Sequence, residues 1–139
     1  MKIYVDSSVL LRVVLGEPSR LKEWSRITMA VSSEIIRVES LRVLDRLRLT
    51  VGMNDRALAR RRATTLELLE AFELVRVNRA VLERAADPFP SVVRTLDAIH
   101  LASALLCRSR HPGIRFATHD AELASAALAC GLRPLGVDV

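Results

Sequence analysis

The sequence contains few cysteines and few aromatic residues. Only Cys107 and Cys130 occur among 139 residues, and they form neither a CxxC pair nor a His/Cys spacing suited to a metal. We therefore expect neither a disulfide framework nor a structural zinc site. Aromatic residues make up 4% of the chain, so a surface that stacks nucleobases is not expected either.

Long hydrophobic runs are also missing. The first residues, MKIYVDSSVLLRVVLGEPS, begin like a signal peptide, but Asp6 and Arg12 interrupt the apolar run. The most apolar later stretch, TLDAIHLASALL, is broken by His100 and followed by Arg108. It falls short of the roughly 18 to 20 apolar residues that a membrane span needs. We expect a soluble, cytoplasmic protein without a membrane partner.

Lysine is scarce as well, although the chain is basic. The net charge of +5 rests on arginine, since only Lys2 and Lys22 are lysines. Arginine is the better bidentate ligand for phosphate, so a polyanionic partner is expected. Half of the residues are hydrophobic, which is enough for a substantial core at this length. We expect a single domain over residues 1–139.

Segments typical of strands alternate with segments typical of helices along the whole chain. Short β-branched or aromatic runs predict strands over residues 2–6, 27–31, 73–77, 114–118 and 133–137. Helical spacing predicts helices over residues 7–15, 33–50, 54–72, 78–87, 95–106 and 119–131, with a short one around Trp24. The helix starts have candidate caps in Ser7 or Ser8, Ser32 or Ser33, and Thr95. The alternation predicts an α/β fold, a three-layer α/β/α sandwich with a mostly parallel central sheet.

The predicted helix over residues 33–50 is amphipathic. Its apolar stripe consists of Ile35, Val38, Leu41, Leu44 and Leu47. Glu39 has Ile35, Ile36 and Val43 as its neighbours one turn away, so this acid borders the buried face.

Three further acids lie where a strand gives way to a helix or where a helix begins. Asp6 closes the first predicted strand, Asp120 follows the strand over 114–118, and Asp97 lies in the first turn of the apolar helix that starts at Thr95. Ligands of open parallel sheets bind beyond the carboxyl ends of the strands, where these acids are expected. The alternative is that they are helix caps or favourable dipole partners, as Asp97 would be behind Thr95.

If the four acids converge, they need a compensating cation. Two like charges about 4 Å apart repel by about 4 kcal/mol at an effective dielectric of 20. Carboxylates without matching His or Cys ligands suit Mg²⁺ or Mn²⁺ better than zinc. Such ions, bound to phosphate, activate an attacking water and stabilise the leaving oxygen. The pattern therefore favours a nuclease.

Four segments, in this order, resemble PIN-domain proteins and specifically the VapC toxins of bacterial toxin–antitoxin pairs: YVDSSVLL, SEIIRVESLRVL, RTLDAIHLASAL and FATHDAELASAA. The resemblance implies a PIN-like fold and a metal-dependent endoribonuclease. Its catalytic acids would be Asp6, Glu39, Asp97 and Asp120. Of these, Asp6, Asp97 and Asp120 would hold Mg²⁺ or Mn²⁺, and Glu39 would be a further ligand or the base that orients the attacking water. Ser7 or Ser8 and Thr118 would support the site, although Ser7 and Ser8 fit a capping role equally well.

The resemblance also implies partners. It implies a structured RNA substrate, a transfer or ribosomal RNA, whose cleavage arrests translation, and a cognate VapB-type antitoxin that neutralises the toxin. We also expect a homodimer, because amphipathic helices with exposed leucines and valines rarely stay bare. The densest basic segment contributes Arg56, Arg60 and Arg61 as candidate RNA-phosphate ligands. Alternatively, these arginines form a solvated face that pairs with Glu67 and Glu70.

Other functions and roles remain as alternatives. A non-catalytic PIN-like module that binds RNA or a partner would keep the fold without a competent metal site. A phosphatase of the haloacid dehalogenase class also starts from a strand-one aspartate, but it needs a second acid where Ser8 stands. His100, one turn after Asp97, is interpreted as a packed core imidazole. His119 is interpreted as a surface or capping residue.

Overall fold

The computed structural model describes residues 1–138 and contains a five-stranded parallel sheet with six α-helices. Val139, the last residue of the predicted domain, lies outside the described residues. The predicted α/β alternation and the parallel sheet are confirmed. The elements are β1 (Lys2–Val5), α1 (Ser7–Val14), a 3₁₀ turn (Trp24–Arg26), β2 (Met29–Ser33), α2 (Ile35–Thr50), α3 (Asp55–Glu70), β3 (Glu73–Val75), α4 (Arg79–Ala86), α5 (Thr95–Cys107), β4 (Arg115–Ala117), α6 (Ala121–Ala129) and β5 (Arg133–Leu135).

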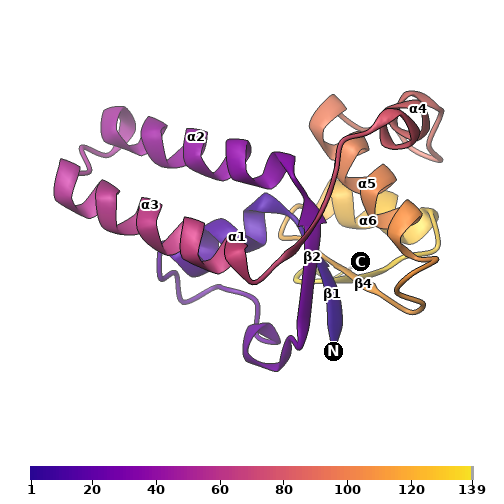
Figure 1. Cartoon of the computed structure of the whole chain (residues 1–139), viewed down its shortest axis with the longest axis horizontal. Coiled ribbons are helices and arrows are strands. Elements are labelled where there is room, and N and C mark those ends of the chain that lie inside the picture. The colour runs from indigo at the N-terminus through magenta and orange to yellow at the C-terminus, as the bar shows by residue number, and fades with distance from the viewer. Residues whose placement is uncertain (139) are drawn as a thin grey trace.

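The sheet is covered by helices on both faces. Helices α1, α2 and α3 lie on one side of β1 and β2, and α4, α5 and α6 lie on the other (Figure 1). Successive β1 side chains point to opposite faces, so Ile3 and Val5 pack in the cluster under α1–α3, whereas Tyr4 packs with Leu101 and Phe116 under α5 and α6. The predicted three-layer sandwich is therefore confirmed.

The order of the strands is β3-β2-β1-β4-β5. The chain moves outward from β1 through β2 to β3, and then returns to the other side of β1 to form β4 and β5. Strand order thus reverses next to β1. In open α/β sheets this topological switch point, at the carboxyl ends of the strands, is where ligands bind. The residues that follow β1 and β4 face this position.

The predicted bounds of the second strand are wrong by two residues. The strand begins at Met29 and runs through Ser32 and Ser33, which were expected to cap the next helix. Both serines are fully buried, and the Ser32 hydroxyl donates to the Val5 carbonyl at 2.6 Å. Pairing with β3 extends the strand, since Ser33 is in register with Val75. Ser33 still contributes to the start of α2, because its hydroxyl accepts from the Ile35 amide at 3.3 Å.

The predicted caps of α1 and α5 are also wrong, and so is the predicted burial of Val38. Asp6, rather than Ser7 or Ser8, caps α1 by accepting from the Val9 amide. Arg94 occupies the N-cap position of α5, and Thr95 is the first helical residue. Val38 is 63% exposed although it shares the stripe with Leu44, which is 1% exposed. The buried face of α2 is centred on Ile36, Ser40 and Leu44, and the helix packs against α3 and α1.

Cys107 and Cys130 are free thiols, and Cys107 is buried. Burial raises the pKa of the Cys107 thiol to about 11. Among the helices of residues 1–138, none combines the length and apolar character that crossing a membrane requires.

Candidate active site

Asp6 lies at the centre of a buried hydrogen-bond network where β1 passes into α1. It is 4% exposed. Its Oδ1 accepts from the Ser8 hydroxyl at 2.6 Å and from the Val9 amide at 3.2 Å. Its Oδ2 accepts from the Thr118 hydroxyl at 2.6 Å, across 112 residues of chain. Capping of α1 and the contact with the segment after β4 together fix the orientation of this carboxylate.

The segment Thr118–Asp120 continues the network from the other strand. The His119 amide donates to the Ser8 hydroxyl at 3.0 Å, and the Asp120 amide donates to the Thr118 hydroxyl at 3.0 Å. Ser8 and Thr118 therefore connect this segment to both oxygens of Asp6. Asp120 itself caps α6, because its Oδ1 accepts from the Glu122 amide at 2.9 Å and from the Leu123 amide at 3.1 Å.

The turn after β5 supports this segment from behind. Thr118 is fully buried, and its amide donates to the Leu135 carbonyl at 2.9 Å. Gly136 has a φ of +101° and lies so close to the Thr118 carbonyl that a Cβ would clash with it. Only glycine meets both conditions without strain. Its importance is invisible in the sequence, where Gly136 is one glycine in a polar terminal stretch.

Asp97 approaches the same place from the first turn of α5. Burial raises its pKa above the usual value, and the charge of Asp120 raises it further. His100 lowers the pKa, whereas Asp6 and Glu39 add smaller increases. Hydrogen bonds connect the segments that carry the other acids, because Thr118 joins the Asp6 carboxylate to the Asp120 amide. His100, one turn after Asp97, contacts both Glu39 and Tyr4 of β1. The segments that carry the four acids thus meet at the carboxyl edge of the sheet.

Burial also raises the pKa of Asp6, while the hydrogen bonds from Ser8 and Thr118 lower it. The chain therefore stabilises the charge of this carboxylate only in part. Burial is the largest cause of the raised pKa of both Asp6 and Asp97, so the surroundings of these two carboxylates disfavour their charged forms.

Glu39 enters from α2 with a side chain that is 15% exposed. Its Oε1 lies 2.5 Å from Nε2 of His100 on α5. His100 is 1% exposed, as expected for a core imidazole. The contact with Glu39 was not foreseen, and the only signal for it in the sequence was the position of His100 one turn after Asp97.

The remaining predicted residues lie at various distances from the acids. Ser7 is half-buried in the first turn of α1. His119 is half-buried, and its Nδ1 lies 3.1 Å from the Gly136 carbonyl.

Arg56 and Arg60 are exposed on α3, but Arg61 donates to the Val14 carbonyl at 2.7 Å. Val14 is the far end of α1, about 12 Å from Asp6 at 1.5 Å per residue. The structure does not bring these arginines into the acid cluster.

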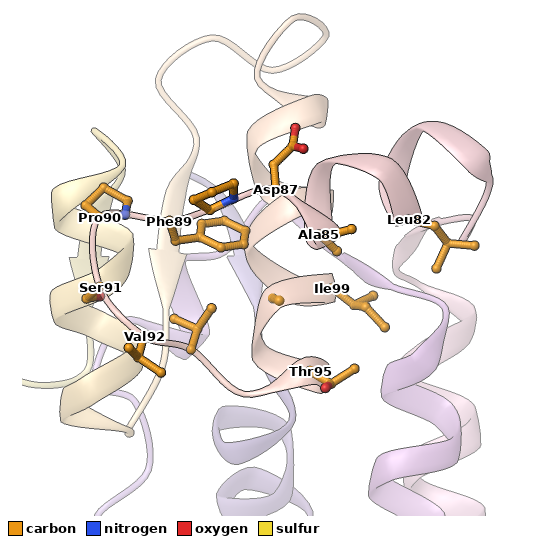
Figure 2. Close-up of a pocket in the computed structure, with 13 residues that line it drawn as sticks. Leu82, Ala85, Asp87, Phe89, Pro90, Ser91, Val92, Thr95 and Ile99 are labelled. Atoms are coloured by element: carbon orange, nitrogen blue, oxygen red, sulfur yellow. The ribbon is translucent and has the colours of Figure 1, made fainter.

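Two cavities flank the start of α5. One, of about 480 Å³, is bordered by Asp97 and Arg94, with Glu122 and Leu123 of α6 opposite. A second, of about 650 Å³, lies on the other side of the helix start, between α4, α5 and the loop that joins them. Figure 2 shows Leu82 on α4, Ile99 on α5 and Phe89 on the loop that joins the two helices. None of the four acids lines the larger cavity, so we assign the chemistry to the one that adjoins Asp97.

The donor set fits a hard divalent cation. All four acids offer carboxylate oxygens, and their mutual repulsion would be relieved by positive charge. Among residues 1–138, no three His, Cys, Asp or Glu side chains are arranged to hold an ion together. The carboxylate oxygens suit an ion such as Mg²⁺, which commonly takes one or two carboxylates and keeps several waters.

Acids clustered at the switch point of a parallel, doubly covered sheet define a class of α/β proteins that bind ligands at this edge. The PIN domain family model matches residues 3–128, so this chain belongs to the PIN domain family. Two relatives from Mycobacterium tuberculosis are similar over most of their length. Ribonuclease VapC46 is 35% identical over 94% of this chain and 93% of its own, and ribonuclease VapC47 is 30% identical over 88% of each. The predicted resemblance to PIN-domain VapC proteins is confirmed.

Solved structures show the same fold. A toxin–antitoxin complex from Klebsiella pneumoniae contains a chain that superposes with a TM-score of 0.67, at 13% identity, with 99% of each chain covered. A crystal structure of a protein from Pyrobaculum aerophilum gives a TM-score of 0.56 at 17% identity, with 96% of this chain and 83% of the other covered. At these identities the likeness supports the fold alone.

Proposed function

We propose that this chain, as one PIN-like domain, is a toxin that hydrolyses phosphodiester bonds of a structured cellular RNA in the cytoplasm. The observation that carries the proposal is the hydrogen-bond network at the switch point. It joins Asp6 through Thr118 to the Asp120 amide, and it joins Glu39 through His100 to the helix that carries Asp97. The relatives named ribonuclease VapC46 and VapC47 support the same chemistry.

Each acid has a proposed role that follows from its surroundings. Asp6 and Asp97 would contact Mg²⁺ or Mn²⁺ directly, and Asp120 would complete the shell directly or through water. The ion would supply the charge that stabilises the phosphate and lowers the pKa of an attacking water. Ser8 and Thr118 fix Asp6 through the contacts described above. Glu39, held outside the Asp6 network, is proposed to orient the attacking water or to serve as a further ligand.

The substrate would be recognised through its phosphates. With few aromatic residues and a net charge of +5, the protein is suited to backbone contacts, and Arg56 and Arg60 remain exposed for them. We propose a transfer or ribosomal RNA as the target, with arrest of translation as the result.

We further propose a cognate VapB-type antitoxin and a homodimer as partners. The apolar side chains that stay exposed support binding of proteins, because patches of this kind are usually covered. They include Val38 and Leu49 on α2, Leu82 on α4 and the fully exposed Val92 on the loop before α5. The solved toxin–antitoxin complex with this fold agrees with such an assembly.

The test is cleavage of total bacterial RNA by the purified protein, free of antitoxin, with Mg²⁺ or Mn²⁺ and with EDTA. We expect discrete, metal-dependent cuts that leave a 5′-phosphate and a 3′-hydroxyl, since water is the proposed nucleophile. Asp97→Asn should reduce the rate by more than about 100-fold, because it removes a charge from the ion site. Sequencing of the cut ends identifies the target.

The control is Asp87→Asn, which changes an exposed acid at the end of α4. It should cleave like the wild type. Ends that carry a 2′,3′-cyclic phosphate contradict the proposed nucleophile. A folded wild-type protein that binds RNA but leaves it intact with both ions supports the non-catalytic binding module instead.

A further inference from the structure

His100 connects the strand that carries Asp6 with the helix that carries Glu39. The imidazole lies in α5 and is 1% exposed. Its Nδ1 is 2.8 Å from the Tyr4 hydroxyl of β1, and its Nε2 is 2.5 Å from Oε1 of Glu39 on α2. Both ring nitrogens therefore have partners, and the two partners lie 96 and 61 residues away in the chain.

The contact with Glu39 determines that Nε2 carries a hydrogen, which it donates to the carboxylate. The contact between Nδ1 and the Tyr4 hydroxyl is satisfied with either group as the donor. The opposite tautomer would place the Nε2 lone pair against a carboxylate oxygen, which is repulsive at this distance.

Packing holds the same ring in place. Tyr4 meets His100 edge to face, with ring centroids 5.8 Å apart, and stacks on Phe116 with centroids 5.2 Å apart. An imidazole fixed by two hydrogen bonds and by an aromatic neighbour that is itself stacked on Phe116 has little freedom to rotate. It can therefore fix the carboxylate that it contacts.

We propose that His100 is a positioning residue that holds Glu39 in a single orientation through the chain Tyr4 Oη–His100–Glu39 Oε1. Glu39 then presents its second oxygen to the reacting water in one direction. This inference rests on the proposed function, because it assigns Glu39 a task in that reaction. It gives a role to a buried histidine that the acid motif does not include.

The alternative is that His100 is only a satisfied core residue. The chain offers a matched control in His111, which is 8% exposed and whose Nε2 lies 2.8 Å from Oε2 of Glu73 in β3. This is also a buried histidine paired with a glutamate, but β3 is the edge strand, two positions from β1. Loss of the His111 contact disturbs packing without touching the acid cluster.

The experiment compares two substitutions that change different ring contacts. The amide nitrogen of Gln overlaps Nε2 of histidine, so His100→Gln keeps a donor to Glu39. The shorter His100→Asn keeps only the contact near Tyr4. We expect kcat of His100→Asn to fall by about 10- to 100-fold at unchanged KM, as for other residues that orient site groups. His100→Gln should recover most of this loss, and His111→Asn should leave kcat unchanged.

A double-mutant cycle with Glu39→Gln separates positioning from stability. If His100 acts through Glu39, His100→Asn should cause no further loss of kcat in the Glu39→Gln background. Additive losses, or equal kcat values for His100→Asn and His100→Gln, overturn the proposal. If His100→Asn does not fold, Tyr4→Phe replaces it, because it removes only the hydroxyl and should lower kcat in the same direction.

A second readout does not depend on RNA cleavage. In the proton–nitrogen NMR spectrum of the imidazoles, Nε2 of His100 should carry a hydrogen. Its proton should be shifted strongly downfield, and Glu39→Gln should reduce this shift while leaving His111 unchanged. An Nε2 without a hydrogen, or no response to Glu39→Gln, overturns the inference. A wild type that cleaves no RNA contradicts the proposed function, and the spectrum still decides the role of His100.

Discussion

The carboxylate of Asp97 is half-buried among other acids. Burial raises its pKa first, followed by the charge of Asp120, with smaller increases from Asp6 and Glu39 and a decrease from His100. An acid whose pKa is higher in the folded than in the unfolded protein destabilises the fold once it ionises. The metal-free protein should therefore be less stable because Asp97 is charged.

This predicts a pH-dependent difference in stability between the wild type and Asp97→Asn. Below the unfolded pKa of about 3.9 the carboxyl group is neutral in both states, so it causes no destabilisation. As the pH rises through the higher folded pKa, the wild type should lose stability relative to the variant. At pH 7 in EDTA we expect Asp97→Asn to be the more stable of the two proteins.

Urea unfolding of both proteins between pH 4 and 7.5, in EDTA, measures this difference. Asp87→Asn, which alters an exposed acid away from the cluster, serves as the control for general charge effects. A difference that does not change with pH, or a wild type that gains stability over Asp97→Asn as the pH rises, contradicts the proposed mutual repulsion of the acids.

Single residues of the site could be predicted from the sequence where the signal is local. Asp6 and Asp120 stand out because each follows a β-branched or aromatic run, and Asp97 because it interrupts an apolar helix. The role of His100 could not be predicted, since it depends on Tyr4 and Glu39, which only the packing of α5 against β1 and α2 brings near. The same holds for Gly136, whose neighbour Thr118 is in another strand connection.

At the level of helices, α3 is attached to the end of α1 by an arginine. Arg61 is half-buried and donates to the Val14 carbonyl at 2.7 Å. The last carbonyls of a helix lack partners within it and carry partial negative charge, so a guanidinium is favourable there. Arg61 therefore has an internal partner, whereas its neighbour Arg60 is exposed.

Substitution of Arg61 should change the free energy of unfolding much more than substitution of Arg60. Arg61→Ala removes a charged hydrogen bond and should lower the free energy of unfolding by about 1.5 to 3 kcal/mol. Arg60→Ala should change it by less than about 0.5 kcal/mol. If Arg60 contacts RNA phosphate, Arg60→Ala should also reduce the slope of log affinity against log salt by about 0.7 to 0.9.

Chemical denaturation and RNA binding at several salt concentrations test both effects. Equal stability losses in Arg61→Ala and Arg60→Ala contradict the structural role of Arg61. An unchanged salt slope in Arg60→Ala favours the solvated-face interpretation of the basic segment.

Helices and strands could be predicted in kind and order, but less well at their ends. The β2 strand extends over two buried serines because β3 pairs beside them, and pairing partners are not visible in a single segment. Val38 lies on the apolar stripe of α2 and is nevertheless exposed, because the buried face of the helix is centred on Ile36 and Ser40 instead. Periodicity gives the existence of a buried face, but its exact centre depends on the neighbouring helices.

For the whole molecule, the α/β alternation was sufficient to predict a parallel sheet with helices on both faces. It was not sufficient for the order β3-β2-β1-β4-β5. That order places β1 beside β4, so Asp6 meets Thr118 and the segment that leads to Asp120. Convergence of the acids is therefore a property of the topology. The sequence supported it through the acids at predicted strand ends and helix starts and through the resemblance to PIN-domain proteins.

A cluster of like charges at this edge predicts that divalent cations stabilise the entire fold. An ion that binds only the folded state adds RT ln(1 + [L]/Kd) to the free energy of unfolding, about 1.4 kcal/mol at ten times Kd. For a chain of this size the corresponding rise in Tm is roughly 3 to 5 °C. Mg²⁺ and Mn²⁺ should both produce a saturable increase in Tm.

Thermal unfolding at pH 7.5 over a range of Mg²⁺ concentrations tests this prediction, with NaCl at matched ionic strength to account for screening. Asp97→Asn should start from a higher Tm in EDTA, because the repulsion is gone, and should gain less from Mg²⁺, because a ligand is gone. The two curves should therefore approach or cross as Mg²⁺ increases. Parallel curves for the wild type and Asp97→Asn would mean that the ion binds elsewhere, and the acids would then need another source of compensating charge.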